Sequence, residues 1–234
     1  MYFLFSGEGS TDMGKGRLQD RICEGNDYEL GPMAMIVDQV VKHRTGCSVI
    51  QEGQYGFAPK NELIKKAKAA RPGKKGMTLP GVDREKETAY FYHSARAFGT
   101  WAKKIQEKRR EVVVAVLFRD CDKEGQDRGV WQHKWNSMLD GFTEAAFNHG
   151  VPMLPKPISE AWLLCALKNN PYQNCDALEK RSSSPKAKKP LKNELDKVCD
   201  GTDICSLVKS GRVNALKIDM PSFNAFKEKL LEVI

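Results

Sequence analysis

The chain has 234 residues, of which 41% are hydrophobic and 29% charged, and its formal net charge is +8 at pH 7. This length allows a real hydrophobic core, and no apolar stretch approaches the ~20 residues that a membrane-spanning helix needs. The excess of positive charge favours a polyanionic partner such as nucleic acid.

The chain contains seven cysteines, an odd number, and no C-x-x-C pair. This argues against a disulfide framework or a zinc ribbon, so we expect reduced thiols. The N-terminus lacks a charged region followed by a long apolar one, which a secretory signal would need. We therefore expect a cytoplasmic protein without a membrane partner.

The first half of the chain begins with an apolar run at residues 2–5, which predicts a short strand. A polar, glycine-rich segment follows through Gly31. Pro32 then opens a helix that Gly46 closes, and residues 47–51 are a candidate second strand. The pattern thus indicates a strand, a helix and a strand in succession.

A short surface helix, a basic loop and a long helix are expected next, over residues 61–70, 71–83 and 84–109. The run at 112–118 is β-branched and too short for a helix, so it predicts a buried strand. A helix over 130–148, a short strand over 151–154 and a helix from Ser159 complete the series.

Alternation of strands and helices predicts an α/β fold with a mainly parallel, four-stranded sheet wound by right-handed crossovers. We place this domain at residues 1–178. Residues 179–193 are a basic segment, either flexible or ordered by a ligand, and 194–234 are helical. Residues 194–234, about 40 in number, are too few for a core of their own, so we expect residues 179–234 to pack on the same domain.

Two aspartates, Asp120 and Asp122, come directly after the predicted strand at 112–118. In an extended chain, residues i and i+2 point to the same side, so both carboxylates are aimed at one point. Converging carboxylates repel unless a proton or a cation lies between them, and a hard divalent cation commonly does so. The alternative is ordinary turn chemistry at a strand end.

Glu8 follows the first strand and is flanked by glycines, which let the backbone turn and approach a ligand closely. Ligands of open parallel sheets bind outside the carboxyl ends of the strands. Glu8, Asp120 and Asp122 could therefore meet at that edge. The alternative is an N-terminal turn carboxylate.

At this point the chain resembles TOPRIM domains, which occur in topoisomerases, primases and overcoming-lysogenization-defect nucleases. The resemblance extends to small stand-alone TOPRIM-like proteins that are often encoded beside an ATPase in phage-defence loci. Four short motifs carry the resemblance and span nearly the whole chain. They are Glu-Gly-x-Thr-Asp at 8–12, Asp-x-Asp at 120–122, Pro-x-x-Glu-Ala-Trp-Leu-Leu at 157–164 and Pro-Ser-Phe-x-x-Phe at 221–226.

The resemblance implies a TOPRIM-like (Rossmann-like) sheet with a helical C-terminal extension, and roles for the acidic residues. Glu8 would be a general acid/base or a metal ligand, and Asp120 and Asp122 would hold Mg²⁺ or Mn²⁺. Asp12 is either another metal ligand or the cap of a turn. Glu160 is implied to be an active-site acid, against the alternative of helix-dipole compensation in a first turn.

Basic residues offer candidate phosphate contacts at Lys156, Lys186, Lys188 and Lys189, although a lysine run is usually only a solvated surface. Arg119 alternates away from the aspartates along the strand, so we expect no direct role for it. The four histidines lack metal-ligand spacing. The glycines near the N-terminus lack the G-x-x-x-x-G-K-[ST] pattern, so any ATPase would be a partner protein.

The leading hypothesis is a metal-dependent TOPRIM-type nuclease, acting on DNA or RNA in an anti-phage system with an ATPase partner. The alternative is a non-catalytic module of the same fold that binds nucleic acid or the ATPase. A phosphatase of the haloacid-dehalogenase type also uses a strand-end Asp-x-Asp. Its motif lies near the N-terminus and is followed by Thr or Val, whereas Lys123 follows Asp122 here.

Overall fold

The computed structural model describes residues 1–9, 11–69, 86–121 and 128–234. Four strands form one parallel sheet in the order β4-β1-β5-β6. Their bounds are β1 Tyr2–Ser6, β4 Tyr55–Phe57, β5 Val113–Phe118 and β6 Gly150–Met153. Every residue of β1 and β5 is buried, as expected for central strands covered on both faces. The predicted α/β fold with a four-stranded parallel sheet is confirmed.

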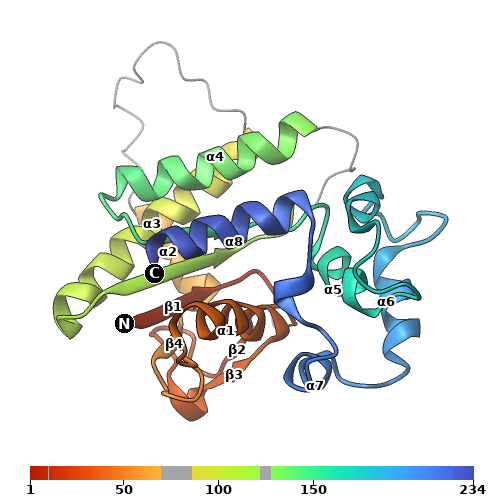
Figure 1. The fold of residues 1–234 in the computed structure, drawn as a ribbon. Helices are drawn as coiled ribbons and strands as arrows, with labels where there is room; N and C mark the ends of the chain where they lie inside the picture. Colours follow the sequence, from red (N-terminus) through yellow and green to blue (C-terminus); the bar gives the residue numbers. More distant parts are fainter. Residues whose placement is uncertain (10, 70–85, 122–127) are drawn as a thin grey trace.

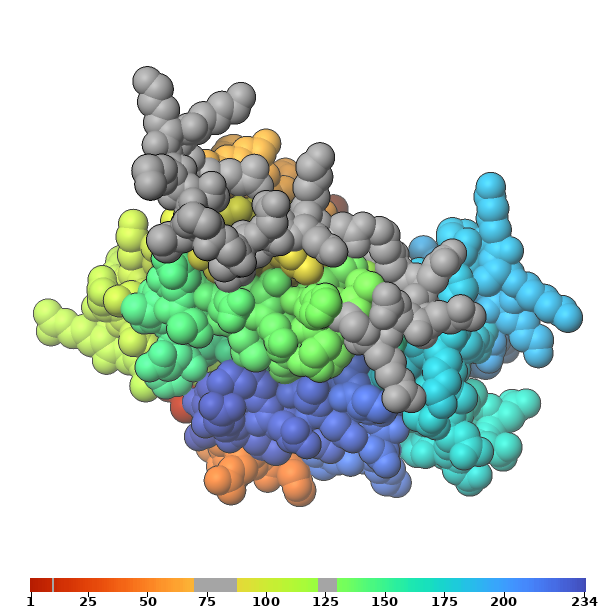
Figure 2. Space-filling model, turned by 90° about the horizontal axis from the view of Figure 1, so that it is seen from above, coloured from red at the N-terminus to blue at the C-terminus, as the bar shows by residue number. Residues whose placement is uncertain are grey.

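Helices cover both faces of this sheet, with α3 and α4 on one face and α1 and α8 on the other (Figure 1). The helices are α1 Pro32–Thr45, α2 Lys60–Ala69, α3 Lys86–Arg109, α4 Arg128–Glu144 and α8 Pro221–Val233. Both α4 and α8 pack on the edge strand β6, and they lie side by side in Figure 2. Within the described ranges, no helix is both long and apolar enough to cross a bilayer.

The order of the strands reverses between β1 and β5. From β1 the chain moves to β4 on one side, and from β4 it crosses over to β5 on the other side of β1. In open α/β sheets, ligands bind in the crevice outside the carboxyl ends of the two strands at such a reversal. The topology therefore predicts a ligand site in the region that follows Ser6, the end of β1, and Phe118, the end of β5.

The expected strand at 47–51 is wrong, because the second strand of the sheet is β4. Asp38 on α1 accepts hydrogen bonds from Ser48 Oγ at 2.8 Å and from the Ile50 backbone N–H at 3.1 Å. These bonds hold the segment in turns, so its backbone does not pair with a neighbouring strand. The strand β4 lies later in the chain and has only three residues, which pair with β1 beside Phe3 and Phe5.

The glycine-rich segment after Glu8 contains an antiparallel pair that the sequence did not indicate, β2 (Gly14–Gly16) with β3 (Tyr28–Leu30). Gly14 has a φ of 103° there, and a Cβ atom at this position would lie 2.0 Å from the Glu29 carbonyl oxygen. A glycine is therefore required where the two short strands meet.

The C-terminal residues add three further helices, α5 Ser159–Leu167, α6 Leu191–Cys199 and α7 Ile204–Lys209. Short 3₁₀ segments lie at Gly25–Asp27 (η1), Cys175–Lys180 (η2) and Ala215–Lys217 (η3). Helix α6 packs on α5, and α8 packs on β6 and α1. Buried side chains of these helices belong to the same hydrophobic cluster as those of the sheet.

Two of the four motifs behind the resemblance contact each other in this core. The Trp162 ring lies 4.9 Å from the ring of Phe223 and 5.8 Å from that of Phe226. Its indole N–H donates to Ser222 Oγ at 2.8 Å. The buried Glu179 carboxylate accepts from both the N–H and the hydroxyl of Ser222, at 2.8 and 2.6 Å. These residues therefore dock α8 against α5.

One disulfide joins Cys165, in the last turns of α5, to Cys175 at the start of η2. The expectation that the thiols are all reduced is therefore wrong. The two Cα atoms are 5.2 Å apart, within the range that a disulfide spans. The return of the chain after α5 creates this proximity, and cysteine spacing along the sequence does not reveal it.

Candidate active site at the carboxyl end of the sheet

Glu8, two residues after β1, faces Arg119, which follows the last residue of β5. Arg119 Nε lies 3.3 Å from Glu8 Oε1, and the Tyr90 hydroxyl donates to the same oxygen at 2.8 Å. Burial raises the pKa of the Tyr90 phenol, so it stays a hydrogen-bond donor. Glu8 is thus held by a cation and a phenol at the point where the strand order reverses.

The Arg119 guanidinium is wholly buried, while the Glu8 side chain is 23% exposed. Arg119 Nη1 donates to the Phe118 carbonyl at 2.7 Å. Within the described part of the chain, Nε and Nη2 have no hydrogen-bond partner, because the approach of Nε to Glu8 is an ion pair without good hydrogen-bond geometry. A buried guanidinium with unused donors is costly, and such a group in a native structure needs an explanation, of which a functional role is one.

Ser159, the buried first residue of α5, brings three carboxylates together. Its backbone N–H donates to Asp120 Oδ1 at 3.0 Å. Its hydroxyl lies 2.5 Å from Asp12 Oδ1 and 3.3 Å from Glu160 Oε2. A serine hydroxyl carries a single proton, so it cannot donate fully to both carboxylates. Protonation of either carboxyl group would provide a second donor and satisfy this arrangement.

The pKa directions favour protonation of these two carboxyl groups. Burial raises the pKa of Asp12, and the charge of Glu8 raises it further. Burial also raises the pKa of Glu160, and the charge of Asp12 adds to that effect. The Ser159 hydroxyl and the charge of Lys192, on α6, act in the opposite direction on both groups. Asp12, Asp120 and Glu160, gathered around Ser159, are called the acidic cluster below. Lys192 supplies part of the positive charge that offsets the negative charge of this cluster.

The predicted acidic residues that belong to the described part of the chain thus gather at one end of the sheet. Asp12, Asp120 and Glu160 contact Ser159, and Glu8 lies close enough to Asp12 to act on its pKa. Asp122 lies outside the described residues. Its relation to Asp120 stays a prediction.

A divalent metal fits the chemistry of this site, since carboxylate oxygens are the ligands that Mg²⁺ prefers and one or two of them suffice with water. Among the described residues, no group of three or more His, Cys, Asp or Glu side chains is arranged to hold a metal ion. Asp120 is the described member of the predicted pair. The metal site at Asp120 and Asp122 therefore stays a prediction.

The segment that carries Lys186, Lys188 and Lys189 leads into α6, which packs on α5. Lys186, Lys188 and Lys189 are exposed. Lys156 is half-buried, and its charge lowers the pKa of Glu179, which burial raises. Lys156 therefore lies near the contact between η2 and α8.

Four residues of the site were missed from the sequence: Arg119, Tyr90, Ser159 and Lys192. Arg119 was expected to point away because side chains alternate along a strand. The alternation ends with β5 at Phe118, and the Arg119 side chain turns back to its own strand through the bond from Nη1 to the Phe118 carbonyl. An arginine at the exit of a fully apolar strand was the available signal, since buried arginines need a partner.

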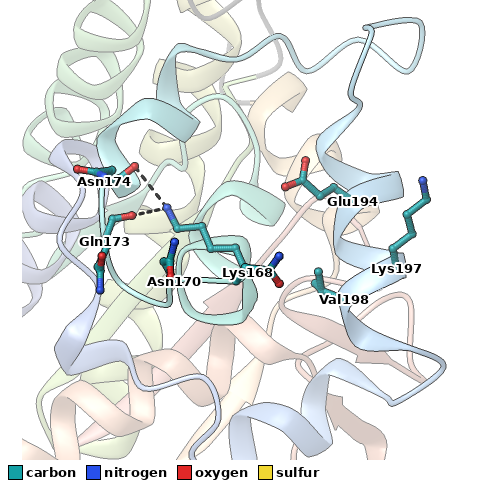
Figure 3. A pocket seen from close by; sticks show the side chains of 8 residues that line it. Lys168, Asn170, Gln173, Asn174, Glu194, Lys197 and Val198 are labelled. Carbon is teal, nitrogen blue, oxygen red and sulfur yellow. Dashed lines mark hydrogen bonds between the residues drawn. The ribbon is translucent and has the colours of Figure 1, made fainter.

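A separate hollow of about 420 Å³ opens beyond the end of α5, between residues 168–174 and α6 (Figure 3). Lys168 Nζ donates there to the carbonyls of Gln173 and Asn174. The opposite wall carries Glu194, whose carboxylate pairs with Arg181 at 2.8 Å. Glu194, the carboxylate in its lining, is already paired within the protein, so the hollow is less suited to binding a metal cation than the acidic cluster.

Comparison with known proteins adds no further assignment. No family model matches the chain, and neither the curated proteins nor the solved structures contain a significant match.

Proposed function

We propose that this protein is a metal-dependent nuclease of the TOPRIM type, which hydrolyses phosphodiester bonds of DNA or RNA. One observation carries the proposal: Glu8, Asp12, Asp120 and Glu160 gather where the strand order reverses, at the carboxyl end of the sheet. Several carboxylates with hydrogen-bonded neighbours at such a crevice are suited to holding a cation and moving a proton.

Each residue then has a proposed role. Asp120, together with Asp122, would hold Mg²⁺ or Mn²⁺, and a bound metal would neutralise charge on the phosphodiester and the departing oxygen. Glu8 is the proposed general acid/base or a further ligand. Tyr90 and Arg119 fix the position of its carboxylate through Oε1.

Asp12 and Glu160 are proposed to bind a proton more readily than free carboxyl groups do, because burial raises both pKa values. This proton reduces the negative charge near the site and eases the approach of a phosphate group. Lys192 and the exposed Lys186, Lys188 and Lys189 are proposed to attract the nucleic acid to this side of the protein. The ATPase partner and the role in phage defence rest on the motif resemblance alone.

The alternative is a non-catalytic module that binds nucleic acid or the ATPase. Two observations favour it: Glu8 is already paired with Arg119, and no described group of three potential ligands is arranged around a metal position. In this reading, the acidic cluster would only fix the start of α5. The two functions differ in a direct assay of cleavage.

The test is cleavage of labelled single-stranded and duplex DNA and RNA with Mg²⁺, with Mn²⁺ and with EDTA. Glu8→Gln should lower the rate by about 10²–10⁴-fold, the usual effect of removing an acid–base group, and Asp120→Asn should lower the rate by weakening the proposed metal site. Glu29→Gln, an exposed charge on β3, is the matched control and should cleave normally. Circular dichroism at the assay temperature confirms that each variant is folded.

Two results would overturn the proposal. Cleavage that persists in EDTA or in Glu8→Gln would assign the activity to something other than this site. Binding of nucleic acid without cleavage under every condition would favour the binding module.

A further inference from the structure

A hollow of about 530 Å³ lies at the other end of the sheet from the acidic cluster. Helices α2 and α3 and residues 20–24 form its walls. Arg109, one of its lining residues, stacks on the ring of Tyr2 at 3.9 Å, and Tyr2 is the first residue of β1. The hollow is therefore at the amino end of the strands, remote from Glu8, and its role is separate from the proposed cleavage.

One wall of this groove is aromatic and apolar. Trp101, half-buried on α3, lines it together with Ile22 and Ile105. Lys66 Nζ lies 4.7 Å from the centre of the Trp101 ring, in a cation–π contact. The Lys66 side chain is 40% exposed and flexible, so a planar ligand could replace it on the ring.

The rest of the groove is positively charged. Five cationic side chains line it against two carboxylates, Asp20 and Glu24. Glu24 is already compensated, because it accepts from the Tyr2 hydroxyl at 2.5 Å and pairs with Arg109 at 3.1 Å.

Lys104 and Lys108 lie on the same side of α3 as Trp101, three and seven residues further on. Across the described ranges, neither lysine is paired with a carboxylate, and both are exposed. The groove therefore has cations available beside an aromatic wall.

We propose that this groove binds a nucleotide unit, with the base against Trp101 and the phosphate at Lys104 and Lys108. A ring face next to unpaired cations matches a ligand that joins an aromatic base to an anion. The volume is within the range of small-molecule sites. The unit is either a free nucleotide or part of a single-stranded nucleic acid, since both present the same chemistry.

The experiment measures binding in EDTA, so that cleavage plays no part and a failure of the proposed nuclease activity leaves it unaffected. Three probes are compared: a labelled 12-nucleotide single strand, an abasic strand of equal length, and AMP as a competitor. Trp101→Leu should weaken binding of the single strand at least about fivefold, the lower limit for loss of one base stack. Lys104→Gln with Lys108→Gln should weaken it and reduce the salt slope by about 1.4, for two single-strand phosphates.

Lys65→Gln with Lys103→Gln is the matched control, because both lysines are exposed on α2 and α3 outside the groove and the loss of charge is equal. Competition by AMP would identify a free nucleotide, and binding of the strand alone would identify a polynucleotide. Either result supports the proposal.

Equal affinity for the abasic strand, or equal losses in the groove and control lysine pairs, would overturn it. If Trp101→Leu does not fold, the lysine pairs still decide, because exposed side chains of this kind contribute little to stability.

Discussion

Arg119 and Glu8 form an ion pair between a wholly buried guanidinium and a carboxylate that is 23% exposed, with 3.3 Å between Nε and Oε1. The pair joins the ends of β1 and β5, the two strands between which the strand order reverses. Two of the three guanidinium nitrogens have no hydrogen-bond partner among the described residues. Glu8 is therefore the main described group that compensates a buried positive charge.

Glu8→Gln should lower the free energy of unfolding by about 1–3 kcal/mol, because it leaves the Arg119 charge buried without a counter-charge. The exposure of Glu8 places the expected loss toward the lower end of this range. Urea denaturation of Glu8→Gln and of the exposed control Glu29→Gln measures the difference. A loss no larger than that of the control would show that Arg119 is neutralised by other groups.

The double variant Glu8→Gln with Arg119→Met should recover part of this loss, because the buried charge is removed together with its partner. The interaction between the two changes, from a double-mutant cycle, should be at least about 0.5 kcal/mol, as for residues in contact. If the effects of the two substitutions are simply additive, the ion pair between Glu8 and Arg119 at 3.3 Å contributes nothing to stability.

Asp12→Asn should make the protein more stable at pH 7. Burial raises the pKa of Asp12 in the folded chain, so the ionised form is disfavoured there. The stability due to such a group is fully present below its unfolded value of 3.8 and is lost as the pH rises through the folded pKa. Asparagine mimics the protonated form and keeps an oxygen for the Ser159 hydroxyl.

The advantage of Asp12→Asn over wild type should therefore shrink as the pH falls toward 3.8. Thermal melting at a series of pH values measures it, with Asp27→Asn as an exposed control for the loss of one charge. An advantage that does not change with pH would contradict a raised pKa at Asp12.

Asp120→Asn and Asp122→Asn together should abolish the stabilisation that Mg²⁺ or Mn²⁺ gives to the wild-type protein. Anything that binds only the folded state raises the melting temperature, by an amount that grows with the logarithm of its concentration relative to its Kd. In metal-free buffer, loss of the Asp120 charge at the start of α5 should cost about 0.3–1 kcal/mol. Melting curves with and without metal test this, with the exposed Asp196→Asn as control. Equal metal-induced shifts in the aspartate variant and in wild type would place the metal elsewhere.

The sequence was sufficient for the parts of the fold that depend on long apolar patterns. The central strands β1 and β5 are buried on both faces, and such strands appear as unbroken apolar runs. The edge strand β4 has only three residues and contains a glycine, so no pattern marks it. Residues 47–51 contain the adjacent β-branched Val49 and Ile50, yet the Asp38 carboxylate binds the polar groups of this segment in a turn.

From the sequence, only those residues of the site were predictable whose position follows from the order of the strands and helices. Residues that follow parallel strands come to one edge, which explains the placement of Glu8 and Asp120. Ser159 was recognised as the start of a helix, but its contacts with three carboxylates depend on how α5 meets the loop after β1. Lys192 acts on the cluster through the packing of α6 on α5, which no local pattern records.

Lys186, Lys188 and Lys189 should contribute affinity for nucleic acid without sequence discrimination, because exposed lysines mainly contact phosphates. Changing all three to glutamine should weaken binding of every sequence similarly and reduce the salt slope by about 2–3 units on a duplex. Lys192 is kept in this variant, because its charge acts on Asp12 and Glu160 and its loss would disturb the acidic cluster.

The matched control for this segment changes three exposed lysines on other helices, Lys42, Lys65 and Lys103, and so removes the same net charge. Fluorescence anisotropy with a duplex of fixed sequence, repeated at several salt concentrations in EDTA, gives both slopes. The segment variant should lose slope and the control should keep it, because net charge acts at long range whereas released counterions report direct phosphate contacts. Equal slopes in the two variants would make these lysines part of a solvated surface, and the lysines beside Trp101 would then be the main phosphate contacts.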